Sequence, residues 1–171
     1  LLLTWTWHPR PLNTAVANSA LLMASKFGMN ISVLIPDQAY RLDPQFMDQA
    51  QAQADASGGR IVVTEDIEQG YRDADWVYAK SWGALPLIGR AEQETQLREP
   101  YQHFIVDEAK MALTRHARFS HCLPLRRNVK ATDGVMDADY CVVQDEAENR
   151  LHTQKAMLMQ LLANDQPGDA Q

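Results

Sequence analysis

Hydrophobic and polar positions along the chain follow two periods, which divide it into strands alternating with helices. Short runs of bulky apolar residues are typical of buried strands. Such runs occur at residues 1–7, 30–36, 60–66, 73–80, 117–122 and 140–144. Apolar residues at helical spacing predict the longer helices, at residues 12–28, 43–59, 107–115 and 145–165. This alternation predicts an α/β fold, a three-layer sandwich with a mostly parallel, Rossmann-like sheet.

The second predicted helix carries recognisable start and stop signals. Asp43 is the predicted N-cap, because its side chain can accept a hydrogen bond from a free backbone N–H of the first turn. Pro44 follows at the first helical position, where a missing N–H costs nothing. Gly58 and Gly59 are expected to end the helix.

Residues 81–100 break the pattern, since no period is visible there. We expect an irregular segment that is functional or disordered. Residues 165–171 are expected to be a frayed tail, so residues 1–164 are predicted to form one domain. The chain starts at a strand-like segment without an initiator Met, and we therefore expect it to be a piece of a longer protein.

The composition suits one compact domain, because 46% of the 171 residues are hydrophobic and 22% are charged. The formal net charge of −6 disfavours nucleic acid as a partner, since a nucleic-acid binder needs a basic surface. No apolar run is long enough to span a bilayer. Two cysteines imply no disulfide framework. We expect a cytoplasmic protein with no membrane partner.

The sequence shows no cofactor motif. Neither a GxGxxG nor a Walker loop follows a predicted strand, which disfavours dinucleotide and P-loop chemistry. The histidines and cysteines lack metal-ligand spacing. The prediction is therefore a Rossmann-like sheet without a dinucleotide fingerprint, and a protein with no cofactor and no metal.

Positive side chains follow two predicted strands. Ligands of parallel sheets bind beyond the carboxyl ends of the strands. Lys80 ends one strand, Arg126, Arg127 and Lys130 follow another, and Arg150 lies early in the last helix. Together they predict a site for a small anion, in which arginine can hold a carboxylate or carbamoyl group by two bonds. The alternative is that these side chains are simply solvated.

The stretch "HCLPLRRNVK" at 121–130 also offers a thiol and a Leu-Pro bond. Cys122 can be a small buried side chain, a nucleophile, or a polar group beside a substrate. A nucleophile needs a base, and His121 is poorly placed because neighbouring strand residues point to opposite faces. The Leu123–Pro124 bond can be cis, although trans is the general rule. Asn13 can cap the first helix or face a ligand.

The segments "HCLPLRRNVKATDGVMD" and "DEAENRLHTQKAML" resemble the signature segments of the second half of the aspartate and ornithine carbamoyltransferase family. The resemblance extends from "WHPRPLNTAVANS" to the last helix. Members of this family have two α/β domains, of which the first binds carbamoyl phosphate through a Ser-Thr-Arg-Thr type loop and the second binds the amino-acid acceptor. No such loop occurs here. The resemblance therefore implies the acceptor domain alone, with the N-terminal domain absent from this chain.

The segment "YAKSWGALP" distinguishes subgroups of the family. Ornithine enzymes carry an aspartate there that pairs with the substrate's α-ammonium, whereas Lys80 repels an ammonium and attracts a carboxylate. The acceptor should then have an acylated α-amine, as in the subgroup that acts on N-acetyl-L-ornithine and also carries "KSWGALP" and "RRNVKATD". Enzymes for N-succinylornithine lack a lysine at the position of Lys130, which favours the acetyl substrate.

The resemblance also implies roles for individual residues. Cys122 and the Leu123 carbonyl would lie beside the carbamoyl and amine nitrogens, and Arg150 would bind the carbamoyl oxygen. Lys80 and Asn13 would hold the α-carboxylate. Arg126 and Lys130 would serve the acyl end, and the matching lysine in the subgroup is carboxylated.

The resemblance implies direct attack by the δ-amine of N-acetylornithine on carbamoyl phosphate, a step of arginine biosynthesis. Residues 81–100 would close over the substrate, and the full-length protein would be a homotrimer. The fragment alone is expected to be inactive. The alternatives are an enzyme for N-succinylornithine or ornithine, and a non-catalytic α/β module that binds a small molecule.

Overall fold

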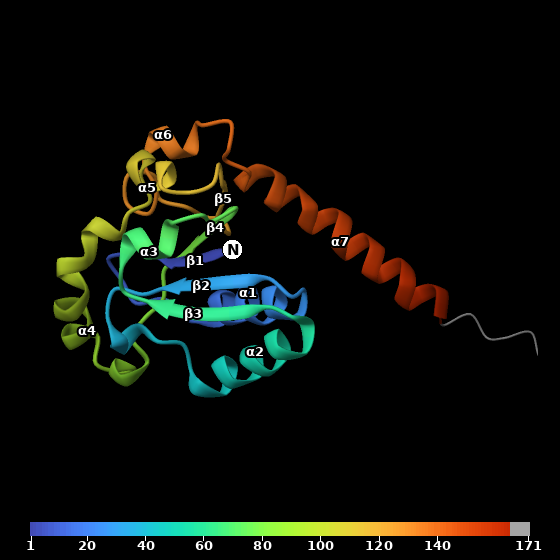
Figure 1. The fold of residues 1–171 in the computed structure, drawn as a ribbon, viewed down its shortest axis with the longest axis horizontal. Helices are drawn as coiled ribbons and strands as arrows, with labels where there is room; N and C mark the ends of the chain where they lie inside the picture. Colours follow the sequence, from blue (N-terminus) through green and yellow to red (C-terminus); the bar gives the residue numbers. More distant parts are fainter. Residues whose placement is uncertain (165–171) are drawn as a thin grey trace, which may run out of the picture.

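The computed structural model describes residues 1–164, in which five strands form one parallel sheet of order β3-β2-β1-β4-β5 (Figure 1). The predicted tail at 165–171 lies outside the described residues. The strands are β1 (Leu2–Trp5), β2 (Asn30–Leu34), β3 (Arg60–Thr64), β4 (Trp76–Lys80) and β5 (Arg118–Ser120). All four pairings are parallel. The α/β prediction is confirmed, and in these residues the sheet is wholly parallel.

Helices cover both faces of the sheet (Figure 1). They are α1 (Ala15–Lys26), α2 (Pro44–Ser57), α3 (Ile67–Tyr71), α4 (Ala91–Arg98), α5 (Glu108–Ala112), α6 (Asp133–Met136) and α7 (Val143–Asn164). Short 3-10 helices occur at η1 (Gln38–Tyr40), η2 (Leu85–Leu87) and η3 (Glu99–Phe104). In residues 1–164 no helix is both long enough and apolar enough to cross a membrane.

The strand order explains which helices share a face. The chain steps outward from β1 to β3 and then returns to β4 on the other side of β1. Because parallel crossovers are right-handed, this reversal puts α1 and α2 on one face and α3 and α5 on the other. The reversal also opens a crevice at the carboxyl ends of β1 and β4, the usual place for a ligand in such sheets.

The core sits between the sheet and its helices. Leu3, Trp5 and Leu21 are among its fully buried side chains, and each aliphatic side chain buried in this way contributes about 1.5–3 kcal/mol. The ring of Trp5 lies 5.0 Å from that of Tyr40 and 5.8 Å from that of Phe104. These contacts fix the carboxyl end of β1, from which the first loop of the site departs.

The predicted signals of α2 are present. The Asp43 carboxylate accepts a hydrogen bond of 2.8 Å from the backbone N–H of Gln45, and Pro44 is the first helical residue. Gly58 adopts a left-handed conformation with φ of 81° at the C-cap, which a residue with a Cβ adopts only with strain.

The prediction of an irregular segment at 81–100 is wrong in part, because it contains η2 and α4. The sequence pattern misses α4 for a physical reason: the buried residues of this helix are Glu94 and Arg98. An ion pair inside the protein lets charged side chains occupy the buried face, so the hydrophobic period of a helix is not visible.

The prediction of a strand at 140–144 is also wrong. Only one isolated bridge forms there, between Cys141 and Phe119, and α7 already begins at Val143. The apolar run serves instead to bury Val143 at the start of the helix. From there α7 runs away from the body of the domain (Figure 1).

Candidate anion site at the carboxyl edge of the sheet

Lys80 stands at the crevice between β1 and β4. It is the last residue of β4 and pairs in register with Trp5 of β1. Its side chain is only 7% exposed, and Nζ donates a hydrogen bond of 2.9 Å to the carbonyl oxygen of Ser81. The strand therefore presents a buried amine at the edge where the sequence predicted it.

Lys130 reaches the same edge from the loop after β5. Its backbone is bonded on both sides: its N–H donates to the carbonyl of Arg126 at 3.0 Å, and its carbonyl accepts from Val106 at 2.9 Å. Lys130 is 4% exposed, and its Nζ lies 3.2 Å from Nε2 of buried His121. Since an ammonium can only donate, Nε2 accepts and the ring proton lies on Nδ1.

Burial and nearby charges shift the pKa of three buried bases, Lys80, His121 and Lys130. Burial, followed by the charge of Lys80, lowers the pKa of Lys130 to about 8. Burial also lowers the pKa of Lys80. Burial and the two lysine charges lower the pKa of His121 to about 3, so the imidazole is neutral near pH 7. The carboxyl edge therefore carries positive charge on two buried amines.

Neither amine has a counter-ion within residues 1–164. None of the ion pairs in this part of the chain includes Lys80 or Lys130. A buried charge without a partner is costly, and a bound anion offsets that cost. The arrangement is therefore suited to bind a small carboxylate or a similar anion.

Other side chains surround the amines. Cys122 is half-buried, and it lies close enough to both lysines that the charge of its thiolate form raises the pKa of each. The pKa of His8, in the loop after β1, is lowered chiefly by burial and further by the charges of Lys130 and Arg126. Four of the predicted site residues, Lys80, Cys122, Arg126 and Lys130, are thus brought together.

Sequence reasoning gave no site role to His8, His121 or Glu146. His121 is the neutral partner of Lys130, and His8 lies near the same charges. Glu146, in the first turn of α7, is half-buried, and burial raises its pKa. The signal for His8 and His121 was their place just after strands. Glu146 also followed a predicted strand, at 140–144, but in the described residues that segment forms only an isolated bridge before α7 begins.

The loop after β5 also positions the remaining residues of "HCLPLRRNVK". The Leu123–Pro124 peptide bond is cis, and Leu123 is 46% exposed. Arg126 is exposed. Arg127, to which the family resemblance gave no role, binds Asp133 at 2.9 Å and Asp137 at 2.5 Å and so ties the loop to α6.

Two predicted site residues make no hydrogen bond to the cluster within residues 1–164. Asn13 is exposed, and its Oδ1 accepts a hydrogen bond of 3.1 Å from the backbone N–H of Ala15, the first residue of α1, although the N-cap position itself is Thr14. Arg150 is exposed on α7, and no hydrogen bond or ion pair of residues 1–164 joins it to the cluster. Their roles toward substrate remain predictions.

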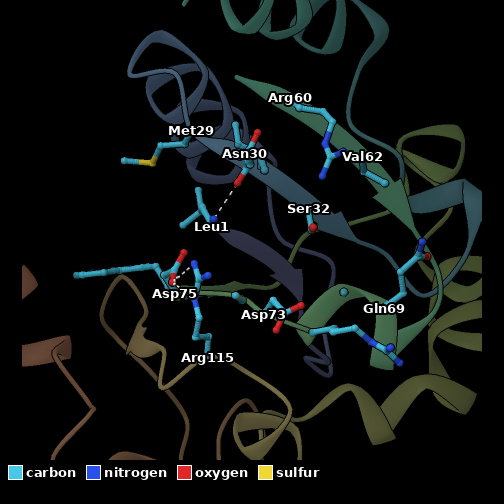
Figure 2. Close-up of a pocket in the computed structure, with 15 residues that line it drawn as sticks. Leu1, Met29, Asn30, Ser32, Arg60, Val62, Gln69, Asp73, Asp75 and Arg115 are labelled. Carbon is cyan, nitrogen blue, oxygen red and sulfur yellow. Dashed lines mark hydrogen bonds and ion pairs between the residues drawn. The ribbon is translucent and has the colours of Figure 1, made fainter. Parts of the chain in front are cut away.

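Two cavities mark opposite edges of the sheet. One of about 440 Å³ lies at the carboxyl edge, between the loop after β1 and the loop after β4, and includes Asn13, Gly83 and Glu94 in its wall. The other, of about 650 Å³, lies at the amino edge, where Arg115 pairs with Asp75 (Figure 2). The larger cavity is therefore remote from the two lysines. Within residues 1–164 no group of three or more His, Cys, Asp or Glu side chains is placed to hold a metal ion.

Several known proteins are similar to this chain in sequence. A profile described as aspartate/ornithine carbamoyltransferase, Asp/Orn binding domain, matches residues 4–161. The chain is 58% identical over 165 residues to N-acetylornithine carbamoyltransferase of Xanthomonas campestris. The aligned part is 96% of this chain and 49% of that protein. It is 38% identical over 148 residues to ornithine carbamoyltransferase of Methanosarcina acetivorans, covering 86% of this chain and 46% of that protein.

A solved structure is also similar to the domain. The crystal structure of acetylornithine transcarbamylase complexed with acetylcitrulline superposes with a TM-score of 0.90 and 60% sequence identity. The match covers 91% of this chain and 47% of that one. The chain thus spans about half the length of the curated relatives it matches.

Proposed function

Since the chain belongs to the aspartate/ornithine carbamoyltransferase family, we propose that it is the acceptor-binding half of an N-acetylornithine carbamoyltransferase. The reaction transfers the carbamoyl group of carbamoyl phosphate to the δ-amine of N-acetyl-L-ornithine, a step of arginine biosynthesis. The observation that carries this proposal is the pair of buried, unpaired amines of Lys80 and Lys130 at the carboxyl edge.

The charge of this pair selects among acceptors. Plain ornithine carries an α-ammonium beside its α-carboxylate, and the buried ammonium of Lys80 repels it. Acylation turns the ammonium into a neutral amide and leaves the carboxylate as the only charge at that end. Lys80, with Asn13, holds this carboxylate, and Arg126 and Lys130 serve the acyl group.

The transfer needs no covalent enzyme intermediate. The lone pair of the δ-amine forms the new C–N bond at the carbamoyl carbon, and the C–O bond to phosphate breaks. Phosphate leaves with the electrons of that C–O bond and accepts the proton that the amine loses. Cys122 and the Leu123 carbonyl orient the nitrogens. Arg150 stabilises the negative charge that develops on the carbamoyl oxygen, once the other half of the protein brings α7 to the site.

The remaining parts of the proposal concern the whole protein. Residues 1–164 form the acceptor domain, and an N-terminal half binds carbamoyl phosphate. The full-length protein is a cytoplasmic homotrimer that uses no cofactor.

The proposal is tested with a chimaera that joins the N-terminal half of the Xanthomonas campestris relative to Leu1 of this chain. We expect carbamoyl transfer to N-acetylornithine by the chimaera, weak or no transfer to ornithine and N-succinylornithine, and no transfer by the 171-residue chain alone. Product formation is measured by mass spectrometry. A folded chimaera that is inactive with all three acceptors points to a non-catalytic module, and preference for ornithine overturns the acyl assignment.

Lys130 is expected to form a carbamate with CO₂, since only the neutral amine reacts. Its pKa of about 8 lies below the usual 10.5. The fraction of Lys130 that is neutral therefore rises around pH 8, whereas that of an ordinary lysine rises around pH 10.5. In ¹³C-bicarbonate the carbamate signal should increase from pH 7 to 9 by about tenfold and then level off. The measurement is ¹³C NMR of the chain.

Two variants control this experiment. Lys130→Arg should remove one carbamate signal from the spectrum, and Lys26→Arg, which changes an exposed lysine at the end of α1, should leave that signal unchanged. An equal signal from the Lys130→Arg variant would show that another amine is modified.

A further inference from the structure

Two loops at the carboxyl edge carry the proposed carboxylate ligands. The loop after β1 holds Asn13, and the loop after β4 begins directly behind Lys80. The two loops are joined by a backbone hydrogen bond, in which the N–H of Gly83 donates to the carbonyl of Leu12 at 2.7 Å. A Cβ on Gly83 would lie 3.1 Å from that of Pro11, so this close approach favours glycine. The spacing of the two loops is therefore tightly defined at this point.

One buried ion pair of α4 bonds to both loops. Glu94 is 1% exposed, and its Oε1 accepts a hydrogen bond of 3.1 Å from the N–H of Ala84, in the loop after β4. Arg98 is fully buried, and its Nη1 donates a hydrogen bond of 2.6 Å to the carbonyl of His8, in the loop after β1. Nη2 of Arg98 donates to the same Oε1 of Glu94. A continuous chain of hydrogen bonds thus joins Ala84 to His8.

Stability alone does not account for this pair. Moving two charges out of water is costly, and apolar residues of similar volume in their place are often neutral or stabilising. Oε2 of Glu94 and Nε of Arg98 also have no hydrogen-bond partner within residues 1–164. What the pair supplies is a fixed geometry between two segments that are remote in sequence.

We propose that Glu94 and Arg98 are positioning residues for the acceptor: the pair clamps the two loops at the spacing at which Asn13 and Lys80 hold one carboxylate. This inference rests on the proposed function. Neither side chain touches substrate. A small displacement of binding groups can cost about 100-fold in turnover or binding, so the clamp is expected to act on acceptor affinity and to leave carbamoyl phosphate unaffected.

The clamp is tested first in the 171-residue chain, without any assay of activity. The variant Glu94→Met/Arg98→Met removes both charges and leaves neither unpaired, so it should still fold. By hydrogen–deuterium exchange, the amides of Gly83 and Ala84 should exchange at least about tenfold faster, as for a locally opened segment. The amides of β1 and β4 should not change. An equal rise across the whole sheet, or no rise in the loop, would refute the clamp.

The matched control is the exposed pair Glu68–Arg72, which has the same residue types at the same spacing. Glu68→Met/Arg72→Met should leave the exchange of Gly83 and Ala84 unchanged. Glu94→Gln, which keeps an oxygen for the Ala84 N–H but loses the charge facing Arg98, should give an intermediate rate. If Glu94→Gln unfolds the chain, the neutral double variant still decides the question.

Steady-state kinetics of the chimaera form the second test. Glu94→Met/Arg98→Met should raise the KM for N-acetylornithine by about 10- to 100-fold, while the KM for carbamoyl phosphate stays within about twofold. Equal effects on both KM values would indicate general loosening and would refute a positioning role. If the unmodified chimaera is inactive, the proposed function fails, whereas the exchange result still decides whether the clamp exists.

Discussion

Lys80→Glu in the chimaera should raise the KM for N-acetylornithine by at least about 100-fold, because an attraction of about 3 kcal/mol is lost and a repulsion replaces it. Lys80 carries a buried amine at the carboxyl ends of β1 and β4, and within residues 1–164 its Nζ donates only to the carbonyl of the neighbouring Ser81. It is therefore free to meet a carboxylate, and a glutamate there meets the same carboxylate with like charge.

The KM for carbamoyl phosphate should stay within about twofold, because that substrate is bound by the other half of the protein. Initial rates with each substrate varied in turn separate the two values. Lys26→Glu, an equal charge reversal at the exposed end of α1, is the control and should change neither. Equal effects of Lys80→Glu on both substrates would remove Lys80 from the acceptor site.

Leu158→Glu/Leu162→Glu on α7 should abolish assembly of this chain with a separately produced N-terminal half of the Xanthomonas campestris relative. Leu151, Leu158 and Leu162 are 66%, 58% and 68% exposed, and their spacing puts them on one face of the helix. A helix with such a face normally buries it against another part of the protein. Each leucine buried in this way contributes about 1.5–3 kcal/mol, and a buried glutamate adds a further penalty.

Assembly is measured by analytical ultracentrifugation and by recovery of carbamoyl transfer when the two halves are mixed. The control Thr153→Glu/Gln160→Glu adds the same charge to the opposite face of α7 and should leave both readouts unchanged. If both double variants assemble equally well, the apolar face of α7 is not the contact.

Several parts of the fold depend on residues that are close in sequence. Asp43, Pro44 and Gly58 act within the turn that they start or stop, so the limits of α2 follow from the chain alone. The alternation of strands and helices is equally local, and with right-handed crossovers it leads to a parallel sheet. The predicted strand at 140–144 failed because a short apolar run also suits the buried start of a helix.

Some features of the site can be predicted from the sequence, and others depend on residues that are distant in the chain. That Lys80 and Lys130 follow strands is visible in the sequence, and a parallel sheet gathers strand ends at one edge. Their burial and the lowered pKa of each are not visible, because these depend on what covers the amines. Exposure is equally invisible in the sequence, since Asn13 and Arg150 were predicted at the site and are exposed in the structure.

By itself, the sequence determined the α/β class, the helix limits that rest on caps, the family resemblance and the edge at which charged residues gather. Only the tertiary structure decided that α4 forms, that Arg98 spans from Glu94 to His8, and that His121 meets Lys130. The reason is physical. A cap or a period is a contact between neighbours in the chain, whereas a buried charge is tolerated only where a distant partner supplies its hydrogen bonds.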